Sequence, residues 1–504
     1  MNYVWKKEPN AWTLRSQERE ILSIPLQAGC EDAFECLEEG AWRWTRTCAQ
    51  PMDQMCMTVE SADAVRYWQV PGVNYNGNGW GSGAQYYGYG DRGEPWTYAW
   101  HRVAIPACTY VESENWAMSL FGEETGGMSG SIWAEEGKAR QALLWPEQEG
   151  PKVLFKRCWM DRYQGSMEPQ SAFSALLLVT PAKGLREGYR DLMDFAWRHF
   201  DRALTMEKTP EQIIKLDTLW FRALWHKQFD GLTGFRSGMH WDDSAAMFLK
   251  NNIFEIGWVG QNASVACCLL REFLRTGDQD LRDKALGALD SWVKYAVLDN
   301  GLMLVRLVAD PNHLDSVANG DIPIDLDACN LGTAATYFFK AAKLAEQCGT
   351  PRPEYEKTAL GLCDFALRAQ QENGEFAKSW FMDGSANAKH GTVGVFFTLP
   401  LFDAHRLTGE RKYLDAALRS LDFYYGQFAE SGYTTAGALD SNCIDKESAA
   451  PLLRAALCGY RATRNDQYLQ AAETVAYYLA TWQWHYTVPF PKGSMAADVG
   501  FDTY

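Results

Sequence analysis

Three carboxylates precede an apolar helical pattern in the stretch "ALDSNCIDKESAAPLL", which begins at Ala438: Asp440 and, nearer to the helix, the two acids Asp445 and Glu447. Proline is tolerated in the first turn of a helix and costs about 3 kcal/mol in its interior, so Pro451 predicts a helix that begins near Ser448. Serine is a good N-cap residue, and we expect its side chain to cap this helix. The two acids then lie in the loop, where they either take part in acid–base chemistry or form only a solvated, charged surface.

Other long polar segments carry acids, amides, histidines and tryptophans just before predicted helices. The tryptophans would stack on a sugar ring, and Arg306, Arg236, His240 or His390 would hold a carboxylate if the substrate is a uronide. Each such residue is also compatible with an ordinary structural role, and their recurrence before helices is what favours a carbohydrate cleft. The candidate substrate-binding residues are His240, Trp241, Gln261, Asn262, Arg306, Trp380, His390, Asp440, Trp484 and His485.

Two carboxyl groups that flank a glycosidic bond are the usual means of hydrolysing it. One protonates the leaving oxygen, and the other activates water or attacks the sugar. The acid of such a pair has a pKa raised by burial or by its neighbour's charge. We predict that the pair comes from Glu447 or Asp445 on one wall and from Glu255 or Asp327 on the other.

The sequence indicates no metal site and no other cofactor. It has no H-x-x-x-H motif and no Cys/His spacing typical of zinc, and "DGSAN" and "GSGAQ" lack the G-x-S-x-G elbow of serine hydrolases. The stretch "DLDACN" shares only its acids with a calcium-binding loop.

Helical periodicity is sustained from about residue 184 onward, and the predicted helices come in pairs. The segments "RTGDQDLRDKAL", "LTGERKYLDAAL" and "ATRNDQYLQAAE" share one layout, with Thr276, Thr408 and Thr463 in the same place. Repeated helical hairpins predict a solenoid or a closed toroid. The five predicted pairs span 184–226, 257–294, 328–371, 391–428 and 448–484.

The connections between pairs are long, whereas the turns within pairs are short. Long loops in a compact domain are usually functional. Because each long loop precedes the first helix of a pair, we expect them to gather at one end of the helical array. The four long loops span 227–256, 295–327, 372–390 and 429–447.

The first 182 residues show short strand-like runs separated by turn residues, such as "MCMTVES" and "TYAWHRVAI". Runs of this kind favour an antiparallel β-sandwich. The expected fold class is therefore α+β, with a sandwich-like domain over 1–182 and a helical toroid over 183–504, where the chemistry would lie.

Composition excludes several partners. The chain has 504 residues and a net charge of −16, which disfavours nucleic acid, and no apolar run is long enough to cross a membrane. Its 13 cysteines form no C-x-x-C pair, and several lie in apolar helical patterns. We interpret them as buried free thiols of a cytoplasmic protein.

This layout resembles the (α/α)6-toroid glycoside hydrolases, particularly bacterial ones with an N-terminal β-sandwich. The resemblance covers about residues 184–490, and its best local points are "FEIGWVGQN" and "NCIDKESAAPLL". Such a toroid has six helix pairs, one more than the sequence predicts here. The group includes enzymes that act on uronic-acid glycosides, and the resemblance implies an inverting mechanism.

The leading hypothesis is a glycoside hydrolase whose partner is a carbohydrate substrate. We favour exo action on oligosaccharides or small glycosides, because long loops at the mouth of a toroid close a pocket. The first alternative is a polysaccharide lyase that acts by β-elimination, for which Tyr433 and His390 would matter more than any acid. The second alternative is a non-catalytic carbohydrate-binding protein.

Overall fold

The computed structural model describes residues 3–75, 78–79, 95–123, 127–135, 138–149, 169–200, 208–227, 231–242, 247–250, 253–257, 261–308, 325–435, 444–484 and 486. The chain divides into two compact units. Unit 1 comprises Met1–Thr205, Asn442–Lys446 and Ala476–Tyr504, and unit 2 comprises Met206–Ser441 and Glu447–Val475. Antiparallel strands make up most of unit 1, and helices make up most of unit 2, so the fold class is α+β.

Unit 1 is built on a large antiparallel sheet that curls around one long strand, β6 (Met55–Val70). The first part of β6 pairs with β13 (Lys138–Trp145), and its last part pairs with β10 (Thr109–Ser113). The main strand order is β1-β2-β3-β6-β10-β11-β14-β5-β4. The other strands are β1 (Tyr3–Lys7), β2 (Ala11–Ser16), β3 (Arg19–Pro25), β4 (Cys30–Glu38), β5 (Ala41–Met52), β7 (Asn74–Tyr75), β8 (Asn78–Gly79), β9 (Trp96–Ala99), β11 (Trp116–Phe121), β12 (Ser129–Glu135) and β14 (Gln170–Pro181).

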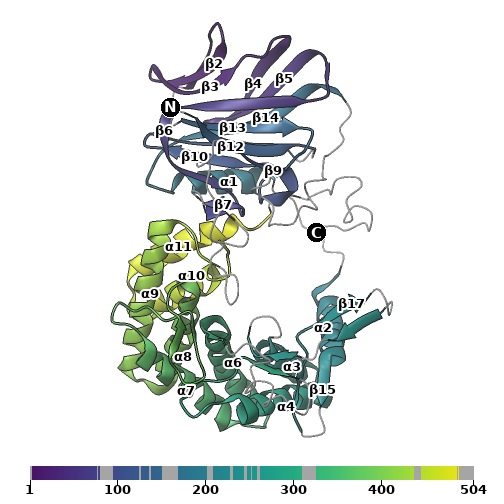
Figure 1. Ribbon diagram of the computed structural model, residues 1–504, viewed down its shortest axis with the longest axis vertical. Helices are drawn as coiled ribbons and strands as arrows, with labels where there is room; N and C mark the ends of the chain where they lie inside the picture. Colours follow the sequence, from purple (N-terminus) through teal and green to yellow (C-terminus); the bar gives the residue numbers. More distant parts are fainter. Residues whose placement is uncertain are drawn as a thin grey trace. The chain divides into compact units, whose positions relative to one another are not determined.

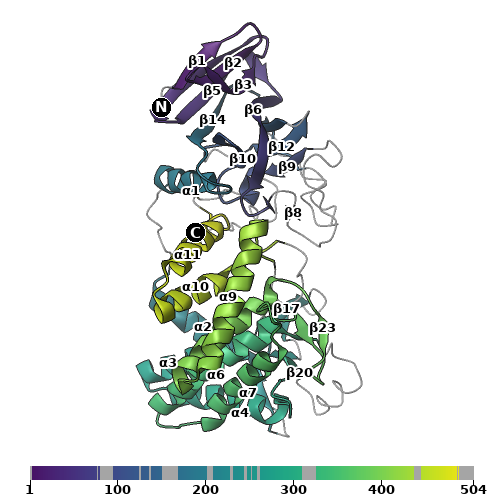
Figure 2. The same cartoon turned by 90° about the vertical axis from the view of Figure 1, so that its left-hand side faces the viewer.

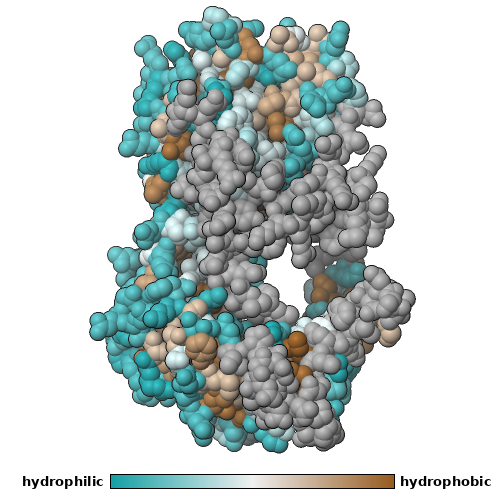
Figure 3. All heavy atoms as spheres, in the orientation of Figure 1, coloured by the Kyte–Doolittle hydropathy of each residue, from teal (hydrophilic) through white to brown (hydrophobic). Residues whose placement is uncertain are grey.

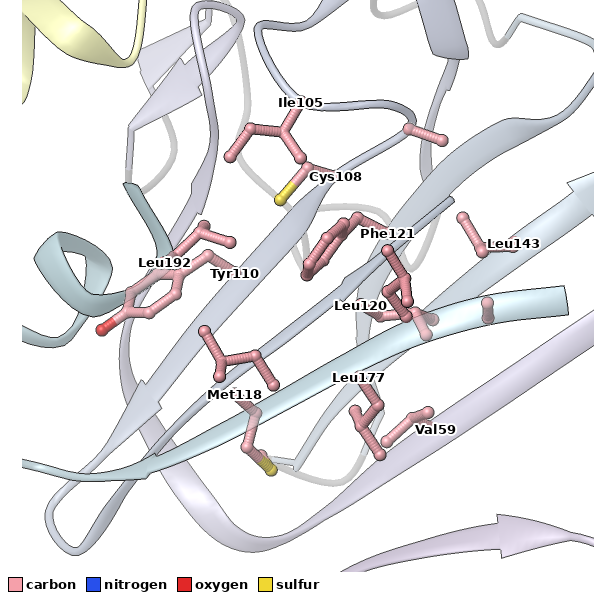
Figure 4. Packing of buried hydrophobic residues seen from close by; sticks show 14 of the residues in the cluster. Val59, Ile105, Cys108, Tyr110, Met118, Leu120, Phe121, Leu143, Leu177 and Leu192 are labelled. Carbon is pink, nitrogen blue, oxygen red and sulfur yellow. The ribbon is translucent and has the colours of Figure 1, made fainter. Parts of the chain in front are cut away.

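The core of unit 1 is a cluster of buried residues on β6 and on the strands of the curled sheet around it. Figure 4 shows Val59, Leu120, Phe121, Leu143 and Leu177 lying near one another, and they come from the four strands β6, β11, β13 and β14. All five side chains are buried, and truncating a buried phenylalanine or leucine costs roughly 2–5 kcal/mol. This core therefore accounts for the strand-like runs that the sequence shows before residue 182.

The first helix, α1 (Gly188–His199), packs on β11 and β14 of unit 1. A Cβ atom at Gly188 would lie 2.5 Å from the Tyr110 hydroxyl, so only glycine allows this close approach. The next helix, α2 (Pro210–Leu224), belongs to unit 2. Both expected helices are present, but they belong to different units, so the expected helix pair over 184–226 is wrong as a pair of one helical domain.

One disulfide corrects the expectation of free thiols. Cys30 of β4 lies opposite Cys48 of β5, and the two are bonded. Of the remaining described cysteines, Cys108, Cys267, Cys329 and Cys363 are buried as expected, whereas Cys36, Cys56 and Cys268 are exposed.

The four remaining predicted helix pairs are present, and all of their helices lie in unit 2 except the end of the last one, which belongs to unit 1 from Ala476 on. The pairs are α3 (Asn262–Thr276) with α4 (Gln279–Ala296), α6 (Ala328–Gln347) with α7 (Pro353–Ala369), α8 (Thr398–Thr408) with α9 (Arg411–Ser431), and α10 (Ala449–Thr463) with α11 (Asp466–Ala480). The first helices contact one another in the order α3, α6, α8, α10. Figures 1 and 2 show these hairpins following one another along an arc.

The shared layout of the hairpin turns has a common local structure. The hydroxyls of Thr276, Thr408 and Thr463 each donate to the carbonyl four residues earlier, at 2.7, 2.8 and 2.8 Å. Each hydroxyl also accepts from the backbone N–H two residues later. The residue directly after each threonine has a positive φ: 76° at Gly277, 73° at Gly409 and 61° at Arg464. The repeat in the sequence is therefore a repeated way of ending a helix.

Short ladders tie together the loops that precede the first helices. The β19 strand (Ile253–Glu255) pairs with β20 (Arg306–Val308), and β21 (Leu326–Asp327) pairs with β22 (Ser379–Trp380). These pairings hold the loops at the N-terminal ends of α3, α6 and α8, as the loop positions predict. The remaining short elements of unit 2 are β15 (Trp225–Lys227), β16 (Thr233–Phe235), β17 (Met239–Asp242), β18 (Met247–Lys250), β23 (Ala386–Ala388) and the 3-10 helix η2 (Thr392–Phe397), and unit 1 contains η1 (Trp100–Arg102).

The outer side of unit 2 around α7 and α9 is mostly hydrophilic in Figure 3. This agrees with amphipathic helices whose alanines and leucines face inward, as Ala417 and Leu421 of α9 do. Within the described residues, no helix is both long enough and apolar enough to span a membrane.

Candidate functional site

The candidate site is built from the loop ends beside α3, α6 and α10 in unit 2. Glu255 is the last residue of β19, and the Arg306 guanidinium donates to its Oε1 from Nη2 at 2.6 Å and from Nε at 3.1 Å. The Glu255 side chain is 12% exposed, so this is a largely buried ion pair. The two residues were predicted separately as an acid and a carboxylate-binding cation, and the structure pairs them with each other.

Asn262 and Gln261 shape the start of α3. The Asn262 side-chain amide donates to the carbonyls of Phe235 at 2.8 Å and Glu255 at 2.9 Å, and its oxygen accepts from the Phe235 N–H at 2.8 Å. Its polar atoms therefore hold the two strands before α3 together. Gln261 has a φ of 42°, and its side-chain oxygen accepts from the Ser264 hydroxyl at 2.9 Å.

Asp327 is the N-cap of α6 and is 4% exposed. Its carboxylate accepts from the backbone N–H of Asn330 at 2.9 Å and from the Asn330 side-chain amide at 2.7 Å. These hydrogen bonds lower the pKa of Asp327, but burial outweighs them and raises that pKa to about 6. A carboxyl group with such a pKa can hold a proton near neutral pH, which is what a general acid must do.

A tight contact fixes the loop before α3 against the start of α6. A Cβ atom at Gly257 would lie 2.6 Å from Oδ1 and 2.7 Å from Cα of Asn330. Gly257 follows Glu255 by two residues, and Asn330 binds Asp327. The contact therefore brings the segments that carry Glu255 and Asp327 to the same end of the helical array.

Glu447 comes to the same region from the start of α10. Burial raises the pKa of the Cys329 thiol well above its ordinary value, and the carboxylates of Asp327 and Glu447 raise it further. Both acids therefore lie close enough to this thiol to interact with it electrostatically. Asp327 is at the start of α6 and Glu447 precedes α10, so the two charges act on the Cys329 thiol from different loops.

The helix after Glu447 begins at Ala449, as Pro451 predicts, but its cap differs from the expectation. Ser448 makes no side-chain capping hydrogen bond. Its hydroxyl is buried and has no hydrogen-bond partner among the described residues, and neither has the hydroxyl of Ser379, which lies opposite Asp327 in the β21–β22 ladder. The predicted capping role of Ser448 is wrong. An unsatisfied hydroxyl thus lies opposite Asp327 in the strand pair, on Ser379, and another follows Glu447 in the sequence, on Ser448.

His390 has a partner that the sequence did not indicate. Its Nδ1 lies 2.9 Å from Oε1 of Glu375. The Glu375 side chain is only 5% exposed, whereas the imidazole is 76% exposed. A buried carboxylate thus orients an open imidazole in the loop before α8. The only signal for Glu375 in the sequence was its place in a long inter-pair loop.

Several other predicted site residues lie elsewhere or outside the described side chains. The Trp380 ring is 2% exposed and packs edge-on against Phe365 and Phe397, so neither of its faces is open to a sugar. Asp445 and Trp484 belong to unit 1, where Asp445 pairs with Lys446 at 3.1 Å and the Trp484 indole donates to the His101 carbonyl at 3.2 Å. The backbones of His240 and Trp241 form part of β17, but their side chains, and all of Asp440 and His485, lie outside the described part of the chain.

The described His, Cys, Asp and Glu residues form no group of three or more that could hold a metal ion. The arrangement offers instead a buried acid with a raised pKa, a second carboxylate from another loop, and a buried ion pair. These groups suit proton transfer to and from a bound substrate.

No protein-family model matches the chain, and no curated protein is similar to it. Solved structures with a similar course of the chain include the GH76 α-mannanase of Bacteroides thetaiotaomicron, with a TM-score of 0.38, 16% identity, and coverage of 57% of this chain and 71% of that one. The unsaturated glucuronyl hydrolase of Bacillus sp. GL1 has a TM-score of 0.34, 16% identity, and coverage of 43% and 61%. The cellobiose 2-epimerase of Bacillus thermoamylovorans has a TM-score of 0.40, 11% identity, and coverage of 57% and 73%. The chain is similar to these enzymes at this level only, and none of them gives it an exact family.

Proposed function

We propose that the chain is a carbohydrate-active enzyme, and more specifically a glycoside hydrolase that acts through Asp327 and Glu447. The observation that carries this proposal is the pKa of Asp327, which burial raises to about 6 at the start of α6. The negative charge of Glu447, which comes from another loop, acts together with that of Asp327 in raising the pKa of the Cys329 thiol. Asp327 would protonate the leaving oxygen, and Glu447 would activate the attacking water. The proposal includes a unit 2 that forms an (α/α)6-like toroid and a unit 1 that forms a β-sandwich.

Glu255 is assigned a different role from the one first predicted. Its carboxylate accepts two hydrogen bonds from the Arg306 guanidinium, the shorter at 2.6 Å, so it is already engaged within the protein. We assign this ion pair to holding the loop before α3 in place. Arg306, which is 28% exposed, would use its outer edge for a substrate carboxylate if the sugar is a uronic acid.

The mechanism we propose is inverting and exo-acting. The two acids come from different loops, which allows the separation of about 6.5–9.5 Å that an inverting pair needs for a water molecule between them. Proton NMR of the first sugar anomer released tests this directly. An anomer of inverted configuration is expected, and retention would contradict a water-activating role for Glu447.

The experiment that tests the proposed function is a screen of the full chain against a panel of nitrophenyl glycosides, including glucuronides. Release of nitrophenol is the expected result. The same screen follows absorbance at 235 nm on uronic-acid polymers, where new unsaturation would show a lyase instead. The lyase is the second candidate because Glu375 holds the exposed imidazole of His390 as a base would be held. Absence of both signals would support a binding protein.

A further inference from the structure

We propose that unit 2 binds a small phosphate ester in a pocket on the helices α6, α8 and α10, apart from the candidate acids. The pocket has a volume of about 430 Å³, within the ordinary range for small-molecule sites. Its charged lining consists of Lys340, Lys343, Asp403, Arg406, Arg454 and Arg461. We call these six residues with their enclosed space the cationic pocket. The proposal does not rest on the glycosidase activity proposed above.

The positive charge of the cationic pocket is only partly compensated by its own lining, which holds five cations and one carboxylate. Its one carboxylate, Asp403, is paired with Arg406 at 2.8 Å. Within the described part of the chain, the four other cations have no carboxylate at ion-pair distance. Uncompensated cations stand out here, because the chain has 64 acidic and 48 basic residues and a net charge of −16. An anionic ligand would supply the missing negative charge.

Stabilisation of helix ends accounts for only some of these cations. Arg406 and Arg461 lie in the last turns of α8 and α10, where positive charge is favourable, whereas Lys343 lies just before the last turn of α6. Lys340 is seven residues from the end of α6, and Arg454 lies in the first half of α10, so the helix dipoles favour neither. These two cations therefore need another explanation.

The two cations outside the helix ends also destabilise each other. Burial lowers the pKa of Lys340, and the positive charges of Arg454 and Arg271 lower it further, although Cys267 and the carboxylate of Asp403 act in the opposite direction. Arg271 belongs to a second hollow of about 340 Å³ that shares Lys340 and Lys343 with the cationic pocket. The positive potential thus spreads over the facing sides of α3, α6 and α10, and a bound dianion would relieve this repulsion.

The chemistry of the lining favours a phosphate ester over a simple anion. Guanidinium groups form paired hydrogen bonds with phosphate oxygens, and the exposed Arg454 and Arg461 can do so. The Asp403 carboxylate would accept hydrogen bonds from hydroxyl groups on the ester's carbon skeleton. Leu399 and Leu457 give that skeleton an apolar wall. A phosphorylated sugar or polyol would suit the guanidinium groups, the carboxylate and the apolar wall together.

Isothermal titration calorimetry of the full chain tests the proposal with glucose 6-phosphate as the probe. Excess glucose is present throughout, so that recognition of the sugar alone contributes no heat. We expect one molecule to bind, and we expect Lys340→Gln combined with Arg454→Gln to weaken binding at least about 10-fold. The matched control, Lys294→Gln with Lys357→Gln, removes the same net charge from helices α4 and α7 and should bind as the wild type does.

Three results would overturn the proposal: no binding of glucose 6-phosphate by the wild type, equal loss in the control pair, or equal affinity for sulfate and glucose 6-phosphate. The last two would mean a response to overall charge and not a built site. Arg461→Gln is the second variant, because its side chain is exposed and its replacement should not affect folding. It should weaken binding at least about 3-fold, and unchanged affinity in both variants would also contradict the assignment.

Discussion

At the scale of single residues, Asp327 shows how position decides the chemistry of a carboxyl group. An N-cap carboxylate that accepts backbone hydrogen bonds ordinarily has a lowered pKa. Asp327 makes those bonds to Asn330, yet its burial is nearly complete and raises the pKa to about 6. The sequence could identify Asp327 as a candidate acid, but not the burial that sets it apart from Glu255.

The raised pKa of Asp327 predicts a specific dependence of stability on pH. The folded state holds the Asp327 proton up to about pH 6, whereas the unfolded state releases it near pH 3.8. The unfolded state therefore binds fewer protons between these values, and stability falls as pH rises through the window. From pH 3 to pH 7 the loss due to Asp327 should be on the order of 3 kcal/mol.

Chemical denaturation at several pH values measures this effect. Asp327→Asn should lack the loss, and because asparagine caps helices as well as aspartate does, the variant should still fold. Asp283→Asn, at an exposed position in α4, is the control and should behave as the wild type. An identical pH dependence in wild type and Asp327→Asn would show that Asp327 does not titrate in this window.

The residues that sequence reasoning placed least well are those whose burial comes from distant contacts. Trp380 has the ring of a sugar-binding residue, but Phe365 and Phe397 cover it. Glu375 lies 15 positions from His390 in the chain, and only the folded loop brings the two together. The type of each residue and its position in a loop could be seen in the sequence. The exposure of its side chain and its contact partners in the fold could not.

At the scale of elements, the hairpin repeat was predictable because its cause is local. Thr276, Thr408 and Thr463 each bond to backbone groups within four residues of themselves. The expected pair over 184–226 was wrong because the apolar face of α1 could not be assigned from sequence to a helix or to a sheet. It packs on β11 and β14.

Arg464 occupies a left-handed position that its counterparts Gly277 and Gly409 fill with glycine. Its φ is 61°, which is strained for a residue with a Cβ atom. Arg464→Gly should therefore stabilise the α10–α11 hairpin by about 0.5–1 kcal/mol in chemical denaturation. Gly409→Ala makes the reverse change where no atom lies within 4 Å, and it should destabilise by about 1 kcal/mol. A destabilised Arg464→Gly protein would contradict the interpretation of this repeat.

Gly257 provides a test of how the site segments are held together. In Gly257→Ala the new methyl group would meet Asn330 at 2.6–2.7 Å, and the start of α6 must shift away. We expect a loss of about 1–3 kcal/mol in unfolding free energy and a clear fall in turnover. Gly426→Ala in α9 is the control, because nothing lies within 4 Å of its added Cβ atom and helix propensity favours alanine. Normal turnover in Gly257→Ala would separate this contact from function.

At the scale of the whole molecule, the chain consists of two units that differ in what stabilises them. Unit 1 relies on its sheet core and on the Cys30–Cys48 disulfide, and unit 2 relies on stacked hairpins. The change from strands to helices could be seen in the sequence, because short strand-like runs give way to apolar residues spaced with the period of a helix. The return of Asn442–Lys446 and Ala476–Tyr504 to unit 1 was not, because only contacts between distant segments reveal it. The predicted boundary at residue 182 stays a prediction.

The disulfide should stabilise unit 1 alone. Cys30→Ala with Cys48→Ala should lower the stability of unit 1 by about 2–4 kcal/mol, since the bond closes a loop over a sequence separation of 18. Hydrogen exchange should increase in peptides from β4 and β5 and stay unchanged in peptides from α6 and α7. Cys36→Ala, which removes an exposed thiol from the same strand, is the control. Equal exchange in both variants would indicate that the bond contributes nothing.

The central claim is that Asp327 and Glu447 are the working acids of a glycoside hydrolase, and turnover of a cleaved nitrophenyl glycoside by single variants tests it most directly. Asp327→Asn and Glu447→Gln should each lower kcat at least about 100-fold, the lower end of the usual acid–base contribution. The exposed control positions Asp283→Asn and Glu473→Gln should stay within about 2-fold of the wild type. Near-normal turnover in both Asp327→Asn and Glu447→Gln would contradict the account.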